Sequence, residues 1–255
     1  AVFVSMYIDR LMINYYLSLE EVGLYGIGYR LASVSTLVLV GFQMALTPLV
    51  YKHYQEPETP QQLATIFRTF LAIVIVIFLI LSLFADVALW ILTTPAYYAA
   101  SQVVVFLVPA ILLSQMYIFA PGIGIAKKTH LLIWINAGGA ILNIFFNWML
   151  IPQVGYVGAG IATLIGYACV FGAHMYCSQK LYYVPHNWGA IAGVVLTAAA
   201  LVTIGLHIHL GLYIDLLIRG CLILLMPGVF LFFGILNWGE IVHVRDFLPA
   251  RWNQR

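Results

Sequence analysis

The sequence predicts an all-α polytopic membrane protein with about eight transmembrane helices. Mean hydropathy is +1.01, hydrophobic residues make up 64% of the chain and charged residues only 8%. Soluble domains carry about 25% charged residues, so this composition excludes the soluble class. The apolar runs are roughly 20 residues or longer and do not alternate in polarity, which favours helices over barrel strands. The basic residues are scattered through short loops, and no nucleic-acid partner is expected.

The apolar runs define the expected spans in order. They lie at roughly residues 1–17, 24–51, 64–93, 101–126, 130–151, 157–179, 188–208 and 212–237. Every second connection lacks Lys and Arg: SLEEVG, TTPAYYAAS, PQVGYVG and HIHLGLY. The opposite side holds eight of the eleven basic residues, in its connections, in the tail and at the start of the third span: Lys52, Arg68, Lys127, Lys128, Lys180, Arg245, Arg251 and Arg255. In loops this short, the bias places the basic side and the C-terminal tail in the cytoplasm.

The ends and connections restrict the function classes. The chain opens on Ala1 inside an apolar span and shows no signal-peptide architecture, so we interpret it as a fragment whose N-terminal part is missing. The outer connections leave no room for a catalytic domain, and we expect no enzyme. Cys169, Cys177 and Cys221 lie in or at the ends of spans, without disulfide or metal spacing. No cofactor or metal is expected.

The fourth span carries several helix breakers. Pro109 lies mid-span, and Pro121-Gly122-Ile123-Gly124 lies near the inner end. We expect a bend at Pro109 and a loosened inner end. Such breaks act as hinges in transporters, but Pro and Gly are also simply commoner in membrane helices than in soluble ones.

A short pattern, V-G-x-x-G-x-G, occurs twice. Residues 22–28 open the second span with it and residues 154–160 open the sixth. No strand precedes either copy and no acidic residue follows at the usual distance, so neither is a nucleotide-binding fingerprint. Small residues at these positions predict close approach between helices.

Charged residues inside the first two spans are the main functional signal. Asp9 and Arg10 lie in the first span and Arg30 in the second. Both arginines lie about ten residues from the SLEEVG turn, which places them at a similar depth, on the order of 10–15 Å from the outer face. Asp9 can pair with Arg30 and leave Arg10 free, or the reverse, and one guanidinium stays uncompensated. The alternative is a fully satisfied Asp–Arg network that only locks the two helices.

Polar residues also follow two helical faces, at ~100° per residue. In the second span the face holds Tyr29, Ser33, Thr36, Gln43 and Thr47, and we favour a wet cavity over interhelical hydrogen bonding there. In the fifth span Asn136, Asn143 and Asn147 share one line, and we favour interhelical hydrogen bonding. The candidate substrate-binding residues are Asp9, Arg10, Asn14, Tyr29, Arg30, Ser33, Thr36 and Gln43.

Three stretches carry a family resemblance: IDRLMINYYLSLEEVGLYGIGYRLAS, FQMALTPLVYKHY and LNIFFNWMLIPQVGYVGAGIATLIGYA. They resemble the Wzx-type polysaccharide flippases of the MOP exporter superfamily, which includes MATE-like transporters. The resemblance covers roughly residues 1–180, and it implies that these form the C-terminal six-helix lobe of a two-lobed transporter that works by alternating access. Residues 181–255 would add two transmembrane helices and a cytoplasmic tail.

The resemblance implies a function in the bacterial inner membrane. The substrate would be an undecaprenyl-diphosphate-linked oligosaccharide for O-antigen, capsule or exopolysaccharide synthesis, and the cationic Arg10 and Arg30 would face the cavity. Implied partners are the lipid-linked glycan, membrane lipid, a coupling ion (Na⁺ or H⁺) and glycan polymerase machinery.

Three other functions predict different sequence features from those of a flippase. A cation-coupled multidrug exporter of the same superfamily prefers an unpaired buried carboxylate, whereas Asp9 has two arginine neighbours. A glycan polymerase or ligase needs a large outer loop, which is absent. A membrane scaffold without transport activity predicts no accessible cavity.

Overall fold

The computed structural model describes residues 2–208 and 210–236, with side chains from Tyr7 onward. Helices are the only regular elements of these ranges. They are α1 Val2–Tyr16, α2 Leu19–Ser33, α3 Thr36–His53, α4 Thr59–Leu83, α5 Ala85–Leu92, η1 Pro95–Ala100, α6 Ser101–Gln115, η2 Met116–Phe119, α7 Gly122–Ile125, α8 His130–Val154, α9 Tyr156–Leu181, α10 Trp188–His207, α11 Leu212–Leu224 and α12 Met226–Phe232.

The length and hydropathy of these helices make the protein a multi-pass membrane protein. Six helical segments of the described ranges are long and apolar enough to cross a membrane, and the bent pair of α2 and α3 would make a seventh. Helix α1, with 15 residues, lies where the first span was expected. The prediction of an all-α polytopic fold is confirmed.

Two compact units make up the chain. Unit 1 comprises Ala1–Ala64 and Ile80–Pro185, and unit 2 comprises Thr65–Leu79 and His186–Arg255. The expected division after residue 180 stays a prediction. It differs from these units chiefly in the middle of α4, which groups with the later helices.

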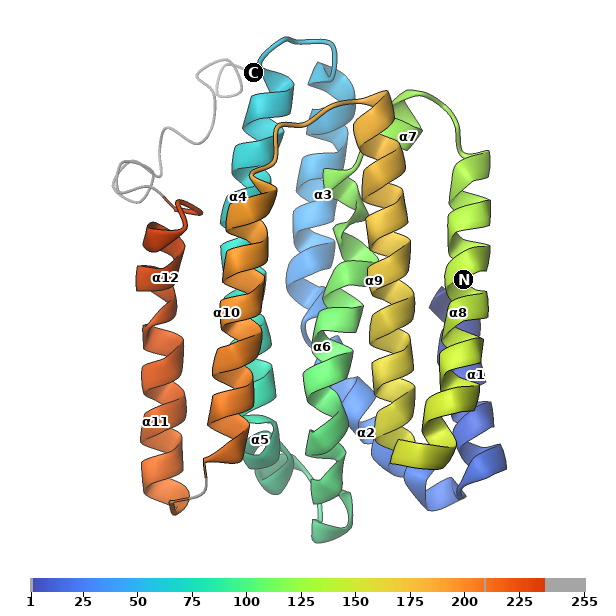
Figure 1. The fold of residues 1–255 in the computed structure, drawn as a ribbon, viewed down its shortest axis with the longest axis vertical. Coiled ribbons are helices and arrows are strands. Elements are labelled where there is room, and N and C mark those ends of the chain that lie inside the picture. The colour runs from blue at the N-terminus through green and yellow to red at the C-terminus, as the bar shows by residue number, and fades with distance from the viewer. Residues whose placement is uncertain (1, 209, 237–255) are drawn as a thin grey trace. The chain divides into compact units, whose positions relative to one another are not determined.

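Unit 1 is built around α6 and α9, which pack along one another, with α8 against α9 (Figure 1). Two glycines of the repeated pattern contact the same α6 side chain. A Cβ on Gly28 would lie 2.5 Å from Val103 Cγ1, and one on Gly160 would lie 2.5 Å from Val103 Cγ2. Only glycine permits so close an approach, and Val103 therefore sets the spacing of α2 and α9 from α6.

The second expected span is two helices, α2 and α3, bent by 42°. The hydroxyls of three residues at the break donate to backbone carbonyls three residues earlier: Ser33 to Arg30 at 2.7 Å, Ser35 to Ala32 at 2.7 Å and Thr36 to Ser33 at 2.6 Å. Such bonds compete with the regular helical ladder and bend helices. The second expected span, residues 24–51, is therefore broken by a bend, and α2 and α3 are long and apolar enough to cross a membrane only when taken together.

The fourth expected span breaks later than Pro109. Helix α6 continues through Pro109 to Gln115, and the chain then passes through η2 and Pro121 into the short α7. At this break the Gly122 N–H donates to Ser178 Oγ at 2.8 Å. A Cβ on Gly122 would lie 2.3 Å from the Ser178 carbonyl oxygen, so α7 and α9 meet only because residue 122 is glycine.

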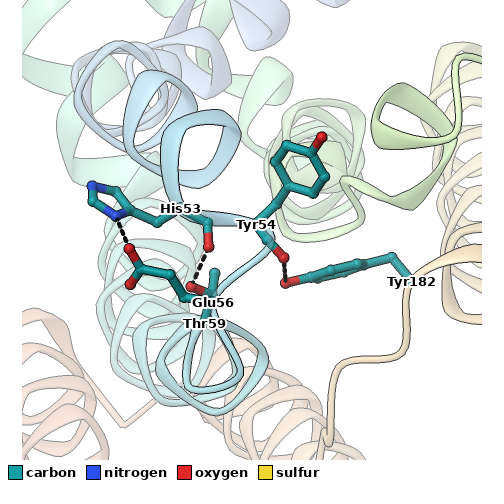
Figure 2. A network of polar contacts seen from close by, with 5 residues as sticks. All are labelled: His53, Tyr54, Glu56, Thr59 and Tyr182. Atoms are coloured by element: carbon teal, nitrogen blue, oxygen red, sulfur yellow. Dashed lines mark hydrogen bonds and ion pairs between the residues drawn. The ribbon is translucent and has the colours of Figure 1, made fainter.

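One end of unit 1 gathers its basic connections. Tyr182, which follows α9, donates its hydroxyl to the carbonyl oxygen of Tyr54, which follows α3, at 3.1 Å (Figure 2). In the same turn His53 Nδ1 lies 2.7 Å from Glu56 Oε1, and the Thr59 hydroxyl donates to the His53 carbonyl at 2.7 Å.

The Tyr182–Tyr54 and Gly122–Ser178 contacts bring four lysines to this end: Lys52, Lys127, Lys128 and Lys180. Such clustering agrees with the charge pattern of the loops. The expected tail arginines Arg245, Arg251 and Arg255 lie outside the described residues.

Unit 2 contains a buried histidine in the α9–α10 connection. The His186 ring lies 4.7 Å from the Phe67 ring and 5.2 Å from the Trp188 ring, centroid to centroid. Neither ring nitrogen has a hydrogen-bond partner among the described residues. Burial disfavours the charged imidazolium and lowers the pKa of His186 to about 4.

Candidate functional site

Helix α1 presents its two charged residues to different surroundings. Successive residues of a helix point about 100° apart. Asp9 is 1% exposed and faces the helices of unit 1, whereas Arg10 is half-buried.

Four neutral groups hold the Asp9 carboxylate. Oδ2 accepts hydrogen bonds from the Tyr25 hydroxyl at 2.7 Å and the Thr163 hydroxyl at 2.8 Å. Oδ1 accepts from the Asn147 amide at 2.6 Å and the Asn143 amide at 3.2 Å. We call these five residues the Asp9 network. It draws on α1, α2, α8 and α9, and it satisfies a buried charge with dipoles alone.

Neither expected pairing of Asp9 with an arginine occurs. No ion pair within 4.0 Å joins Asp9 to Arg10, Arg30 or any other described residue. The carboxylate turns toward α8 and α9 because their asparagines and threonine supply the donors. The expectation of an Asp–Arg pair, in either form, is therefore wrong.

The Asp9 network has spare acceptor capacity. Asn147 Oδ1 is fully buried and has no hydrogen-bond partner among the described residues. Carboxylate, amide and hydroxyl oxygens are the ligands that hard cations prefer. The described residues contain no group of three or more His, Cys, Asp or Glu that could hold a metal ion. With a single negative charge among neutral oxygens, the network suits a monovalent cation or a proton.

The two arginines line a common pocket of about 320 Å³. Its walls come from α1, α2 and η1: Arg10, Val22, Gly23, Gly26, Ile27, Arg30 and Tyr97. No hydrogen bond or ion pair joins either guanidinium to another described residue. We call this the arginine pocket. It presents two unpaired positive charges, and Gly23 and Gly26 leave part of its wall without side chains.

The other candidate residues do not line the arginine pocket. Asn14 is exposed, and the half-buried Tyr29 ring lies 6.5 Å from the Tyr25 ring. The hydroxyls of Ser33 and Thr36 bond to their own backbone. Gln43 Nε2 donates to the Gln115 carbonyl at 2.5 Å and so joins α3 to α6. The bend between α2 and α3 divides the expected polar face, and its α3 part serves packing.

Sequence reasoning missed the partners of Asp9, namely Tyr25, Asn143, Asn147 and Thr163. The asparagine line was predicted to form interhelical hydrogen bonds, but the sequence reasoning did not identify Asp9 as the acceptor of those bonds. A signal was available: an aspartate in an apolar helix needs donors, and Asn143 and Asn147 lie one turn apart on another span.

Comparison with known proteins gives one partial match. Over 80 residues the chain is 34% identical to a curated protein of Geobacillus kaustophilus described as "Probable multidrug resistance protein NorM". The alignment covers 29% of this chain and 17% of that relative's length. It supports a relation to the MOP exporter superfamily. No protein-family model matches the chain, and no solved structure matches it.

Proposed function

We propose that the chain is part of a MOP-type exporter that flips undecaprenyl-diphosphate-linked oligosaccharide across the bacterial inner membrane, with its basic end in the cytoplasm. The observation that carries this proposal is the arginine pocket, in which Arg10 and Arg30 have no anionic partner. An unpaired charge within the membrane is costly and is typical of a functional site.

The chemistry of the arginine pocket suits a diphosphate. Arg stays charged, and its planar fork binds phosphate oxygens in bidentate fashion. Two guanidinium groups match the two phosphates of the lipid carrier. The volume of about 320 Å³ lies at the lower end of the range for ligand sites, enough for a diphosphate and the start of its glycan.

The Asp9 network supplies a site for the coupling ion of this transporter. A Na⁺ ion or a proton on Asp9 would cancel the only charge of the network and change which helix arrangement is favoured. Alternating access needs such a difference in affinity between two states. Because Asp9 and Arg10 are adjacent on α1, a shift of this helix on ion binding at Asp9 would also move Arg10 in the arginine pocket.

Neutralising the arginine pocket tests the substrate. The double variant Arg10→Gln/Arg30→Gln should abolish surface glycan in a flippase-deficient bacterial strain that depends on the full-length transporter, with the protein level in the membrane unchanged. The matched control is Arg10→Lys/Arg30→Lys, which keeps both charges and should retain part of the activity. Normal surface glycan in the neutral double variant would contradict the assignment.

A cation-coupled multidrug exporter is the second candidate. The match to the NorM protein favours it, and so does Asp9, which is buried without an arginine partner. The variant Asp9→Asn separates the two candidates through ethidium and norfloxacin susceptibility. If the protein is a drug exporter, bacteria that carry Asp9→Asn should become more susceptible to both drugs. If it is a flippase, they should lose surface glycan while their drug susceptibility stays unchanged.

A further inference from the structure

The arginine pocket is charged at one end and neutral at the other. Gly23, Gly26 and Arg30 follow one another on α2 at spacings of three and four residues, which places them on one face of the helix. Gly23 lies seven residues, or about 10 Å of helix, closer to the α1–α2 turn than Arg30 does. The wall residues other than the two arginines carry no charge. The pocket therefore extends past the guanidinium groups toward the α1–α2 turn as a neutral space.

Tyr97, in η1, lies at this neutral end. A Cβ on Gly23 would lie 3.6 Å from Tyr97 Cε1, so the tyrosine ring packs beside bare backbone of α2. The side chain is 38% exposed. Its ring makes no ring contact, and its hydroxyl no hydrogen bond, with another residue of the described ranges. An aromatic surface and a hydroxyl are thus available to a ligand in the pocket.

Gly26 leaves open space between Tyr97 and the arginines. It lies between Gly23 and Arg30 on the same face of α2 and lines the pocket. A Cβ added to Gly26 would meet no atom within 4 Å. Any side chain at this position would therefore occupy the pocket itself.

Asn14 adds a polar group on the same side of the arginines. It lies outside the wall of the pocket, but it follows Arg10 by four residues and so shares its face of α1. Helix α1 runs toward the α1–α2 turn, which places Asn14 about 6 Å closer to that turn than Arg10. Its amide is exposed and forms no hydrogen bond with another described residue. An amide offers both donors and an acceptor.

A sugar ring is the ligand that fits this neutral end. It is uncharged, its C–H groups can pack against an aromatic ring, and its hydroxyls can bond to the phenol of Tyr97 and the amide of Asn14. The isoprenoid chain of a lipid carrier has no hydrogen-bonding group and would cover both polar groups without giving them a partner, which is costly. In a lipid-linked glycan the first sugar is attached directly to the diphosphate. A diphosphate on the two guanidinium groups therefore brings that sugar next to the neutral end.

We propose that the neutral end of the arginine pocket binds the first sugar of the lipid-linked glycan. This inference rests on the proposed function, because it takes Arg10 and Arg30 as the diphosphate site. Tyr97 supplies the stacking surface, Gly26 the space for the ring, and Asn14 a hydrogen-bonding partner. The pocket would then select on the sugar that is joined to the diphosphate, and sugars further along the glycan would contribute little to binding there.

Binding to the purified full-length transporter in lipid nanodiscs tests this sugar site. Isothermal titration calorimetry would compare three esters of farnesyl diphosphate that carry the same charge: the methyl, the N-acetylglucosaminyl and the galactosyl ester. The parent should bind both sugar-bearing probes more tightly than the methyl probe. Tyr97→Ala should weaken binding of the sugar-bearing probes about tenfold, through the loss of one aromatic contact and one hydrogen bond, and leave the methyl probe unchanged. Tyr97→Phe keeps the ring and should retain most of the preference.

Gly26→Leu tests the same site from the opposite wall. The added side chain should weaken binding of the sugar-bearing probes at least about tenfold, because it fills the space that the ring would occupy. The matched control is Gly41→Leu on α3, where a Cβ also meets nothing within 4 Å and the residue does not line the pocket. Its binding of all three probes should equal that of the parent.

The outcomes separate the sugar site from the proposed function. Equal affinity of the parent for all three probes, or a sugar preference that survives both Tyr97→Ala and Gly26→Leu, would overturn the sugar site and leave the diphosphate site standing. The proposed function fails with it if the parent binds none of the probes, or if Arg10→Gln/Arg30→Gln binds all three as the parent does.

Discussion

Asp9 and Arg10 are neighbours in the chain, yet the Asp9 network and the arginine pocket are opposite in kind. The carboxylate is fully buried and accepts four hydrogen bonds from neutral groups. The guanidinium of Arg10 lines an open pocket with Arg30, and neither has a partner of opposite charge among the described residues. The two environments differ because successive side chains of a helix point about 100° apart.

The difference teaches how one helix can carry two unlike sites. An Asp–Arg pair would cancel both charges and leave nothing for a ligand. Dipoles stabilise the carboxylate without cancelling it, so its charge stays available to a cation. The arginines are left unpaired and stay available to an anion. Separation by neutral donors therefore leaves both charges uncancelled within a short distance.

The largest expected effect comes from removing the acceptor of the Asp9 network. Asp9→Leu leaves the donors of four buried residues without their partner, and unmet buried donors cost about 1–3 kcal/mol each. We expect a loss of about 3–5 kcal/mol, seen as a lower melting temperature of the purified protein in detergent. Asp9→Asn keeps part of the bonding and should lose less.

Asn14→Leu is the control on the same helix, because Asn14 is exposed. Its melting temperature should stay close to that of the parent. A protein with Asp9→Leu that melts at or above the parent temperature would show that the network contributes nothing to stability.

A smaller loss of stability is expected at the contact between α9 and α6. Gly160→Ala places a methyl group 2.5 Å from Val103 Cγ2 and should destabilise the protein by about 1–3 kcal/mol. The second change Val103→Ala should recover most of this loss, because it removes the clashing methyl. Thermal melting of both variants checks the prediction.

Gly172→Ala is the control for this substitution. Gly172 lies on the same helix, α9, and a Cβ added there would have no neighbouring atom within 4 Å. Two outcomes would show that contact with Val103 does not cause the loss of stability. One is an equally large loss in Gly172→Ala, and the other is no gain in melting temperature when Val103→Ala is added to Gly160→Ala.

The smallest expected effect concerns His186, which is buried like Asp9 but lacks hydrogen-bond partners. Its pKa of about 4 lies below the ordinary 6.5, so the folded state binds fewer protons than the unfolded state between these values. Stability is therefore fully present above pH 6.5 and falls as the pH drops toward 4. The loss should appear as a lower melting temperature of the parent protein at pH 4.5 than at pH 7.

His186→Phe removes the titrating ring while keeping an aromatic contact with Phe67. The difference in melting temperature between the parent and this variant should widen in favour of the variant from pH 7 to pH 4.5. A constant difference across that range would remove His186 as the source of acid sensitivity.

Much of the fold was predictable because bilayer burial imposes long apolar segments. Hydropathy located the helices, and loop charge indicated the end at which Lys52, Lys127, Lys128 and Lys180 gather. The α2–α3 bend was not predicted, because it depends on three hydroxyls that bond to the backbone instead of facing a cavity. A hydropathy average over a window of residues does not detect hydrogen bonds between single side chains and the backbone.

The candidate site was predicted in part, for a different physical reason. The positions of Arg10 and Arg30 follow from helix rise and the length of one turn, which are local. The partners of Asp9 on α8 and α9 lie more than 130 residues away in the chain. Charge complementarity favoured an arginine partner, but the tertiary packing supplied four neutral donors instead.

The double glycine contact on Val103 has a mechanical consequence. One side chain of α6 is the spacer for α2, which carries Tyr25 and Arg30, and for α9, which carries Thr163. Any rotation of α6 that displaces Val103 must move both helices at once. A displacement of this kind would pull Tyr25 and Thr163 from the Asp9 carboxylate and shift Arg30 in the same motion. If Asp9 holds the proposed coupling ion, Val103 would therefore couple the release of that ion to the geometry of the arginine pocket.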